Sequence, residues 1–434
     1  MKLKILSCVL VSALLVSCSG PVEGEAGQPN TPPAPDFATS EYLPEYDFPN
    51  YAPARSTALF RFAYVDDTVV YNDTRNNLFY YSELGSGESY PLCARPECTH
   101  EGRGCDAYGR IANLQYYDGK LYFSDYVLLP GAGEIKREVM ACFRMNPDGS
   151  GKEMLKIVGE DSFNRQLNAE QGSSSGFSFC HRGYNYSIIC VAKVVDAVPS
   201  YDLYVLRRPV DWSSDYEVIY SEKLEGAYST VAEFIRRING SSLYFTDCQT
   251  IRDEETGASR TLRELRRFDL SEGTMTVLGT LPEKFSPVDL WVTEKGEIYI
   301  SGTSLIDGTG GVYRFNNGLE PLYSEPETSR YYFVNGAIVT ADCIYPEFKV
   351  AIRDFDGSII YQGDLPHAFT ETMLELNPTR EKLDGRSFSF SYCYGGKDEL
   401  NIVFGVYLNR EQMQCAVHYD ITPEGLKESL LWHS

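Results

Sequence analysis

The chain has 434 residues, two or three times the length of an ordinary single domain. Its 61 Asp and Glu outnumber its 39 Lys and Arg, so the formal net charge is −22 at pH 7. Such a polyanion is repelled by phosphate backbones, which excludes nucleic-acid binding as its main task. The 32 Tyr, 22 Phe, 36 Gly and 22 Pro, without a long helical pattern, indicate an all-β protein rich in turns.

The beginning of the chain has the pattern of a bacterial lipoprotein signal peptide. Two early lysines precede an apolar run over residues 5–16, which is too short to span a bilayer but typical of a secretory signal. The run leads into residues 15–18 (LVSC), which resemble the lipobox, where the cysteine is acylated and cleavage occurs just before it. We therefore expect a signal peptide over residues 1–17 and a lipid on Cys18. An ordinary signal peptide, with Cys18 incidental, is the alternative.

Residues 18–57 are expected to form a tether. Eight prolines lie in this segment together with scattered glycines and acidic residues. Acidic, proline-rich sequence cannot bury enough apolar surface to fold, so it stays extended. The expected location is the bacterial cell envelope, outside the cytoplasm, with the membrane as a partner through the N-terminal lipid.

One pattern recurs over residues 58–434. An aromatic strand leads through a turn to a second strand that contains an apolar anchor. The clearest copy is residues 115–123 (QYYDGKLYF), followed by residues 142–150 (CFRMNPDGS). Asp-Gly and Pro-Asp-Gly are turn sequences, and between alternating apolar runs they predict a four-stranded meander.

The number and spacing of these apolar anchors give the number of repeats. They are spaced roughly 40–67 residues apart, and propeller blades have periods of about 40–50 residues with insertions in loops. The seven anchors are Val69, Leu121, Ile188, Leu243, Ile298, Ile338 and Ile402. We therefore predict one all-β domain, a β-propeller of seven four-stranded blades closed by pairing strands from the two ends. Six blades remain an alternative, because the unit around Ile188 lacks an Asp-Gly turn.

Two of these repeats and a cysteine-rich segment resemble a known family. Residues 116–123 (YYDGKLYF) and 143–150 (FRMNPDGS) are similar to blades of TolB-like propellers, notably lipoproteins of anaerobic Firmicutes. Residues 93–105, with the spacing Cys-x4-Cys-x-His-x4-Cys, are similar to a signature of those lipoproteins. The resemblance implies a fold and a cellular location, and it implies no reaction.

The same segment supplies a complete set of metal ligands. Cys93, Cys98 and Cys105 provide three thiols and His100 an imidazole within 13 residues, which suits tetrahedral Zn²⁺. Outside the cytosol, a disulfide between two of the thiols is the main alternative. In both cases we expect a structural staple at the crossover between the first two blades; a redox or catalytic role is the remaining alternative.

The sequence predicts no catalytic residue. Gly172–Gly176 matches the G-x-S-x-G elbow around Ser174, but the strand before it and the helix after it are missing, so we interpret it as a Ser/Gly loop. Two function classes remain. The favoured one is a binding module for a glycan, peptide or envelope partner. The alternative is a carbohydrate-active enzyme, a lyase or glycosidase, that uses the propeller funnel.

Overall fold

A computed structural model describes most of the chain from Phe62 to His433. The described ranges are residues 62–65, 67–73, 76–83, 86, 88–110, 112–130, 136–169, 173–195, 198–224, 227–252, 256–293, 295–325, 331–334, 336–375, 387–408 and 411–433. The predicted signal peptide, Cys18 and the predicted tether lie outside these residues. None of the helices in the described ranges has the length and apolar character needed to cross a membrane.

The described strands form seven four-stranded sheets, here called blades 1 to 7 in chain order. Blade 1 comprises β1 (Phe62–Val65), β2 (Thr68–Asp73), β3 (Leu78–Glu83) and β4 (Tyr90–Pro91). Blade 2 comprises β5 (Ala112–Tyr117), β6 (Lys120–Pro130), β7 (Lys136–Met145) and β8 (Glu153–Ile157). Blade 3 comprises β9 (Ser173–His181), β10 (Tyr184–Val195), β11 (Val198–Pro209) and β12 (Glu217–Lys223). Blade 4 comprises β13 (Ala227–Asn239), β14 (Ser242–Arg252), β15 (Ser259–Asp269) and β16 (Thr274–Leu281).

The remaining three blades complete the ring. Blade 5 comprises β17 (Phe285–Val292), β18 (Ile298–Ser304), β19 (Gly310–Phe315) and β20 (Leu319–Glu325). Blade 6 comprises β21 (Tyr332–Val334), β22 (Ala337–Ile344), β23 (Glu347–Arg353) and β24 (Ile359–Asp364). Blade 7 comprises β25 (Phe388–Gly395), β26 (Glu399–Leu408), β27 (Glu411–Thr422) and β28 (Gly425–His433). Short helices join some blades: a 3₁₀ helix (Gly102–Gly104), α2 (Ser162–Ala169) and α3 (Phe369–Glu375).

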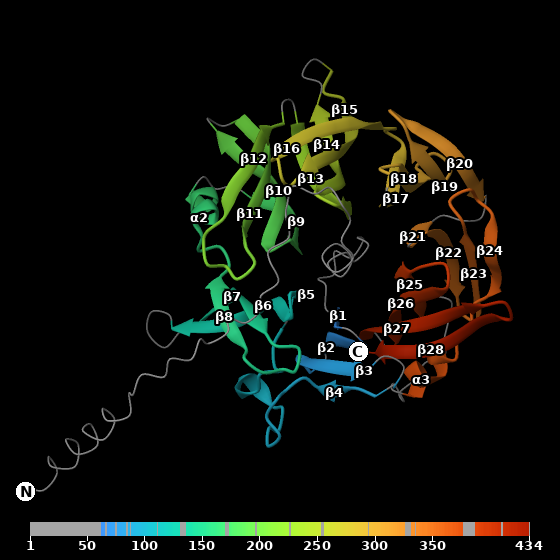
Figure 1. Ribbon diagram of the computed structural model, residues 1–434. Coiled ribbons are helices and arrows are strands. Elements are labelled where there is room, and N and C mark those ends of the chain that lie inside the picture. Colours follow the sequence, from blue (N-terminus) through green and yellow to red (C-terminus); the bar gives the residue numbers. More distant parts are fainter. Residues whose placement is uncertain are drawn as a thin grey trace, which may run out of the picture. The chain divides into compact units, whose positions relative to one another are not determined.

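The blades surround a common axis, as a propeller requires (Figure 1). Within each sheet, consecutive strands pair antiparallel in chain order. First strands such as β1, β9 and β21 lie toward the middle of the ring, and fourth strands such as β4, β8 and β24 lie toward the rim (Figure 1). Every predicted anchor lies on the second strand of a different blade. All of them except Ile298 are completely buried. The predicted all-β, seven-bladed fold is confirmed.

The six-bladed alternative is wrong, because the unit around Ile188 does have the expected turn. In blade 2, Asp118 and Gly119 turn the chain between β5 and β6 with φ angles of 46° and 69°. In blade 3, Arg182 and Gly183 occupy the same place with φ angles of 44° and 82°. Both positions of such a hairpin turn need positive φ, which glycine adopts freely and other residues rarely do. An arginine therefore does here what aspartate does in blade 2.

The Ser/Gly segment is also different from our expectation. Ser174 is part of β9 and pairs with Val191 of β10, so it lies in a strand and not in a loop. A Cβ atom on Gly176 would lie 2.0 Å from the carbonyl oxygen of Ile188. The glycine is thus needed for the close approach of two strands. No helix follows Ser174 in the described strand β9, so the hydrolase elbow is absent at this position.

Apolar side chains between neighbouring sheets hold the ring together. In the described residues, six interfaces each contain an apolar cluster: blades 1–2, 3–4, 4–5, 5–6, 6–7 and 7–1. No apolar cluster of this kind joins blades 2 and 3 among the residues described. That interface therefore has to be stabilised in another way.

The ring closes between blades 7 and 1 by side-chain packing. Trp432 of β28 stacks on Tyr71 of β2 with 5.2 Å between ring centroids. Beside them, the Ser82 hydroxyl donates a hydrogen bond of 3.1 Å to the Leu431 carbonyl. None of the described sheets combines strands from the two ends of the domain, so the predicted strand exchange is wrong for this part of the chain. Closure depends on the apolar cluster between blades 7 and 1, in which Trp432 is the largest buried side chain.

We expect Trp432→Ala to destabilise the whole ring. Trp432 is 2 % exposed, and removal of a fully buried tryptophan costs about 3–5 kcal/mol. Urea unfolding followed by far-ultraviolet circular dichroism should show a single transition that moves to lower urea for this variant. Ile306→Ala, at a site that is 81 % exposed, is the control and should change the free energy of unfolding by less than about 0.5 kcal/mol. An unchanged midpoint for Trp432→Ala would refute this account of closure.

Candidate functional site

The cysteine segment connects β4 of blade 1 to β5 of blade 2, and both of its ends are fixed to β3. The Leu92 amide donates a hydrogen bond of 2.9 Å to the Phe79 carbonyl, and the Phe79 amide donates one of 2.7 Å to the Ala107 carbonyl. Leu92 and Ala107 are buried in the apolar cluster between blades 1 and 2. The segment between them therefore forms a loop that starts and ends beside one strand.

This loop brings the four predicted ligands together. One ligand atom from each of Cys93, Cys98, His100 and Cys105 lies within 4.8 Å of all the others. The Cys105 sulfur is 3.5 Å from Nδ1 of His100. Thiolates bound to Zn²⁺ at 2.3 Å in a tetrahedron lie about 3.8 Å apart, so only small movements separate this cluster from a zinc site. All three cysteines are free thiols in the structure. The cluster could hold a metal ion.

Local backbone geometry forms the loop. His100 and Gly102 have φ angles of 58° and 64°, which reverse the chain between the second and the last cysteine. The His100 amide donates to the Cys98 sulfur at 3.4 Å, as amides do toward sulfur ligands. Burial raises the pKa of Cys105 to about 11. Burial also opposes ionisation of Cys93, but hydrogen bonds from the backbone of Arg95 and from the other two thiols keep the Cys93 pKa below its ordinary value.

Blade 2 packs directly on this segment. The turn between β7 and β8 places Gly149, with a φ angle of 80°, against the backbone of Leu92. A Cβ atom on Gly149 would lie 2.5 Å from the Leu92 carbonyl oxygen. The Pro-Asp-Gly sequence of this turn therefore does two things: it reverses the strand, and it leaves room for the cysteine loop.

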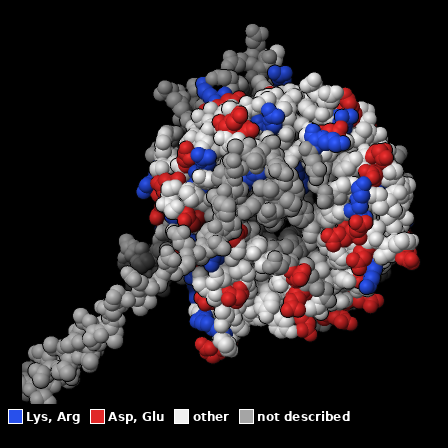
Figure 2. Space-filling view, viewed as in Figure 1, with Lys and Arg blue, Asp and Glu red and all other residues white. Residues whose placement is uncertain are grey.

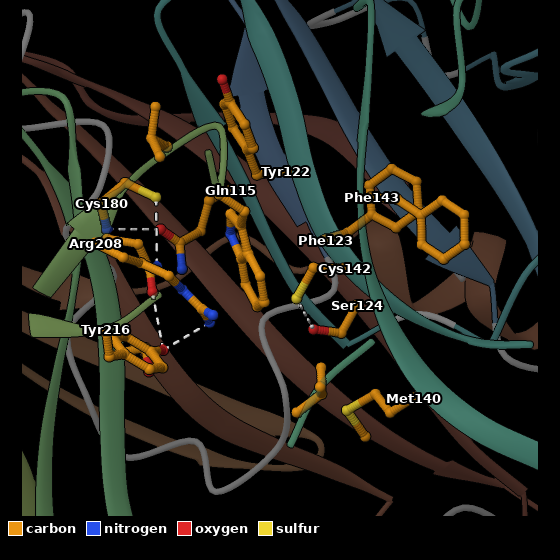
Figure 3. A pocket seen from close by; sticks show the side chains of 15 residues that line it. Gln115, Tyr122, Phe123, Ser124, Met140, Cys142, Phe143, Cys180, Arg208 and Tyr216 are labelled. Carbon is orange, nitrogen blue, oxygen red and sulfur yellow. Dashed lines mark hydrogen bonds between the residues drawn. The ribbon is translucent and has the colours of Figure 1, made fainter. Parts of the chain in front are cut away.

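A second site lies between blades 2 and 3, at the interface without an apolar cluster (Figure 3). It is a cavity of about 150 Å³. Its lining consists of Gln115, Tyr122, Phe123, Ser124, Met140, Cys142, Phe143, Val158, Ser178, Cys180, Asn185, Arg208, Val210, Trp212 and Tyr216. Aromatic walls with a few polar groups are typical of pockets that bind small ligands.

The blade 3 wall of the pocket is one polar face of its sheet. Cys180, Asn185 and Arg208 lie side by side in register across β9, β10 and β11. In the next row, the Ser187 hydroxyl shares a hydrogen bond of 3.0 Å with Tyr216. The Cys180 amide donates to the Gln115 side chain of blade 2 at 2.9 Å. A hydrogen bond between the blades and the polar side chains of one wall thus lie where the other interfaces have an apolar cluster.

Arg208 is the exceptional residue of the pocket. It is 4 % exposed, and its Nη2 donates a hydrogen bond of 2.7 Å to the Tyr216 hydroxyl. Its Nε and Nη1 are buried and have no hydrogen-bond partner among the described residues. The guanidinium lies over the Trp212 ring and 3.8 Å from the centroid of the Tyr216 ring. Burial lowers the Arg208 pKa, yet an arginine stays protonated in proteins.

No described residue forms a direct ion pair with this cation. Burial raises the pKa of the Cys142 and Cys180 thiols to about 12, so both are uncharged near neutral pH. Asp161 contributes to the electrostatic environment of Arg208, but its carboxylate accepts hydrogen bonds of 2.9 and 2.7 Å from the backbone and side chain of Asn164. No ion pair joins Asp161 to Arg208 in this described region. The pocket therefore contains a buried cation without a direct counter-ion, and the nearby buried carboxylate of Asp161 favours its charged form.

Sequence reasoning missed Arg208, Trp212 and Tyr216. The only available signal was a pair of arginines, Arg207 and Arg208, that directly follows the apolar residues 203–206. Arg207 is the half-buried residue of the pair, and its Nε contacts the exposed Glu217 at 2.9 Å. His181 and His418 belong to different blades, 3 and 7, and burial lowers the pKa of His181 to about 3.

Comparisons with known proteins reveal fold similarity only. No protein-family model and no curated protein matches the sequence. An oligogalacturonate lyase from Vibrio parahaemolyticus matches with a TM-score of 0.45 and 11 % identity over 88 % of this chain and 91 % of that chain. A polysaccharide lyase of family PL25, an ulvan lyase, matches with a TM-score of 0.48 and 9 % identity over 88 % and 95 %. A prolyl endopeptidase matches with a TM-score of 0.45 and 11 % identity over 92 % and 51 %. Similarity this distant carries no argument about activity, and the resemblance to TolB-like lipoproteins stays a prediction.

We expect one zinc ion per chain in protein purified without chelator. Cys93→Ser, Cys98→Ser and Cys105→Ser should each lose the metal, because each removes one of four ligands. Cys248→Ser, a half-buried cysteine of β14, is the matched control and should retain it. Elemental analysis measures the zinc content, and thiol titration of the same native samples gives the number of free cysteines. A metal-free protein that lacks two titratable thiols would instead indicate the disulfide alternative.

Proposed function

We propose that this protein is a lipid-anchored binding module of the bacterial cell envelope, whose propeller recognises a glycan, peptide or envelope partner outside the cytoplasm. The observation that carries the binding role is the interface between blades 2 and 3. Among the described interfaces it alone lacks an apolar cluster. It contains a pocket of about 150 Å³ with aromatic walls and the buried cation of Arg208. A pocket that replaces stabilising core packing is an expected sign of a selected ligand site.

The order of the predicted parts along the chain supports the anchor. The lipobox-like residues 15–18 come first, the proline-rich residues follow, and the described propeller starts at Phe62. A lipid on Cys18 would thus precede a long extended segment, which would let the propeller reach partners at some distance from the membrane.

We further propose that the cysteine cluster holds structural zinc. The loop of residues 93–105 has a single buried ligand, Cys105, and the other three are half-buried. A loop with so little apolar burial needs another source of stability, and metal binding supplies it because the ion binds only the folded loop. The zinc would then fix the crossover on which the Gly149 turn of blade 2 rests.

Labelling with a clickable fatty acid in a bacterial host should mark the wild-type protein. Cys18→Ala should abolish the label, since the predicted acylated sulfur is removed. Cys93→Ala is the control, because that thiol belongs to the folded domain and should leave lipidation unchanged. Equal labelling of the wild type and Cys18→Ala would reject the anchor without affecting the proposed binding role.

If the protein is a binding module, it should bind one class of ligand and leave that ligand chemically unchanged. The Cys18→Ala protein, applied to arrays of glycans and peptides, should bind one class, and Ser124→Phe should weaken that binding at least tenfold by filling the pocket. Ser86→Phe, on an exposed turn, is the matched control. Circular dichroism verifies that both variants are folded. Release of shortened products from the bound material would contradict the proposal and favour the alternative, a carbohydrate-active enzyme.

A further inference from the structure

The pocket between blades 2 and 3 has a specific electrostatic defect. Two buried guanidinium nitrogens of Arg208 have hydrogens to donate and nothing among the described residues to receive them. A buried donor without an acceptor costs roughly 1–3 kcal/mol, and more when the group is charged. Native proteins rarely leave such groups unsatisfied, so each one requires an explanation.

The groups around Arg208 leave two of its nitrogens for a ligand. The guanidinium lies over the Trp212 ring and 3.8 Å from the centroid of the Tyr216 ring, and its Nη2 donates to the Tyr216 hydroxyl. The N–H bonds of a guanidinium lie in its plane, and a carboxylate binds in that plane through parallel hydrogen bonds. In Figure 3 the Arg208 side chain extends from β11 toward the middle of the cavity, between the side chains of Gln115 and Tyr216. The two rings and the Tyr216 hydroxyl therefore hold the cation in place, and Nε and Nη1 have no partner among the described residues and are available to an anion.

We infer that this pocket binds the carboxylate of a small monoanionic ligand, with Arg208 as its partner. The inference rests on the proposed binding function and names the ligand class of the same pocket. We expect the ligand to carry a single negative charge, because Arg208 is the one cationic residue among the described lining residues. A dianion such as sulfate would bring an uncompensated negative charge into a buried site, which is strongly unfavourable.

The volume and the lining of the pocket indicate the size and character of the ligand. A cavity of about 150 Å³ accommodates roughly six non-hydrogen atoms, as an engineered cavity of that size does for benzene. The tyrosine, tryptophan and methionine side chains of the lining suit a short apolar part next to the carboxylate. Outside the pocket, acidic side chains gather over the face where β20, β24 and β28 lie (Figure 2).

Propionate and propionamide are the probes that test this inference. They have the same shape, and only propionate carries a charge. Isothermal titration calorimetry on the Cys18→Ala protein should show propionate binding at least tenfold more tightly than propionamide or sulfate. Arg208→Gln should weaken propionate binding at least tenfold. Arg207→Gln is the matched control, because it removes the same charge from the neighbouring residue, which pairs with Glu217 on the surface.

A measurement on protein with Arg208 intact covers the case in which Arg208→Gln does not fold. Nuclear Overhauser effects should connect the propionate methyl group with the indole ring of Trp212. Equal propionate affinity in Arg208→Gln and Arg207→Gln, equal affinity for propionamide, tighter binding of sulfate, or absent contacts to Trp212 would each overturn the inference. Ligand capture on the arrays with no propionate binding would leave the proposed function standing and reject only the carboxylate.

Discussion

The structure depends on one constraint: every blade is a sheet with two faces, and both must be covered by neighbouring sheets. A single four-stranded sheet cannot do this alone, whereas a closed ring gives each face a partner. The ring is complete only when the first and last blades meet. Trp432 and Tyr71 make that contact with stacked rings, and Ser82 adds a hydrogen bond to the neighbouring backbone. Closure by packing makes the stability of every blade depend on residues at the two ends of the domain.

The same constraint explains why the interface between blades 2 and 3 stands out. Six interfaces in the described chain satisfy it with apolar clusters, and this one satisfies it with hydrogen bonds around a cavity. Apolar packing would be the more stable solution, since a buried cation without a counter-ion is unfavourable. Arg208 is partly stabilised by the rings of Trp212 and Tyr216, through cation–π contacts worth up to about 2 kcal/mol when desolvated. An anionic ligand would remove the rest of the free-energy cost of burying this cation.

Blade 2 is the element shared by both candidate sites. In its strands β6 and β7, Phe123 and Phe143 belong to the apolar cluster with blade 1, where Phe123 packs against Phe79 at 4.8 Å between ring centroids, and both residues also border the pocket. The intervening Ser124 and Cys142 line the pocket toward blade 3. The cysteine loop lies beside the first face and the Arg208 pocket beside the second. A metal that holds the loop against the Gly149 turn would therefore also support the sheet that forms one wall of the pocket.

The sequence by itself determined the repeat, because strand pairing inside a blade is local. Each anchor lies a few residues from its turn, so alternation and turn chemistry sufficed to predict seven meanders, and the short spacing of Cys93, Cys98, His100 and Cys105 sufficed to predict a cluster. The mode of closure joins Tyr71 to Trp432, and nothing local encodes a contact across so much chain. The role of Arg208 could not be predicted from the sequence for a related reason. In a propeller both faces of a strand are buried, so alternation cannot tell which of Arg207 and Arg208 faces a cavity. Only the tertiary structure decided that, through the position of blade 2 against the polar face of blade 3.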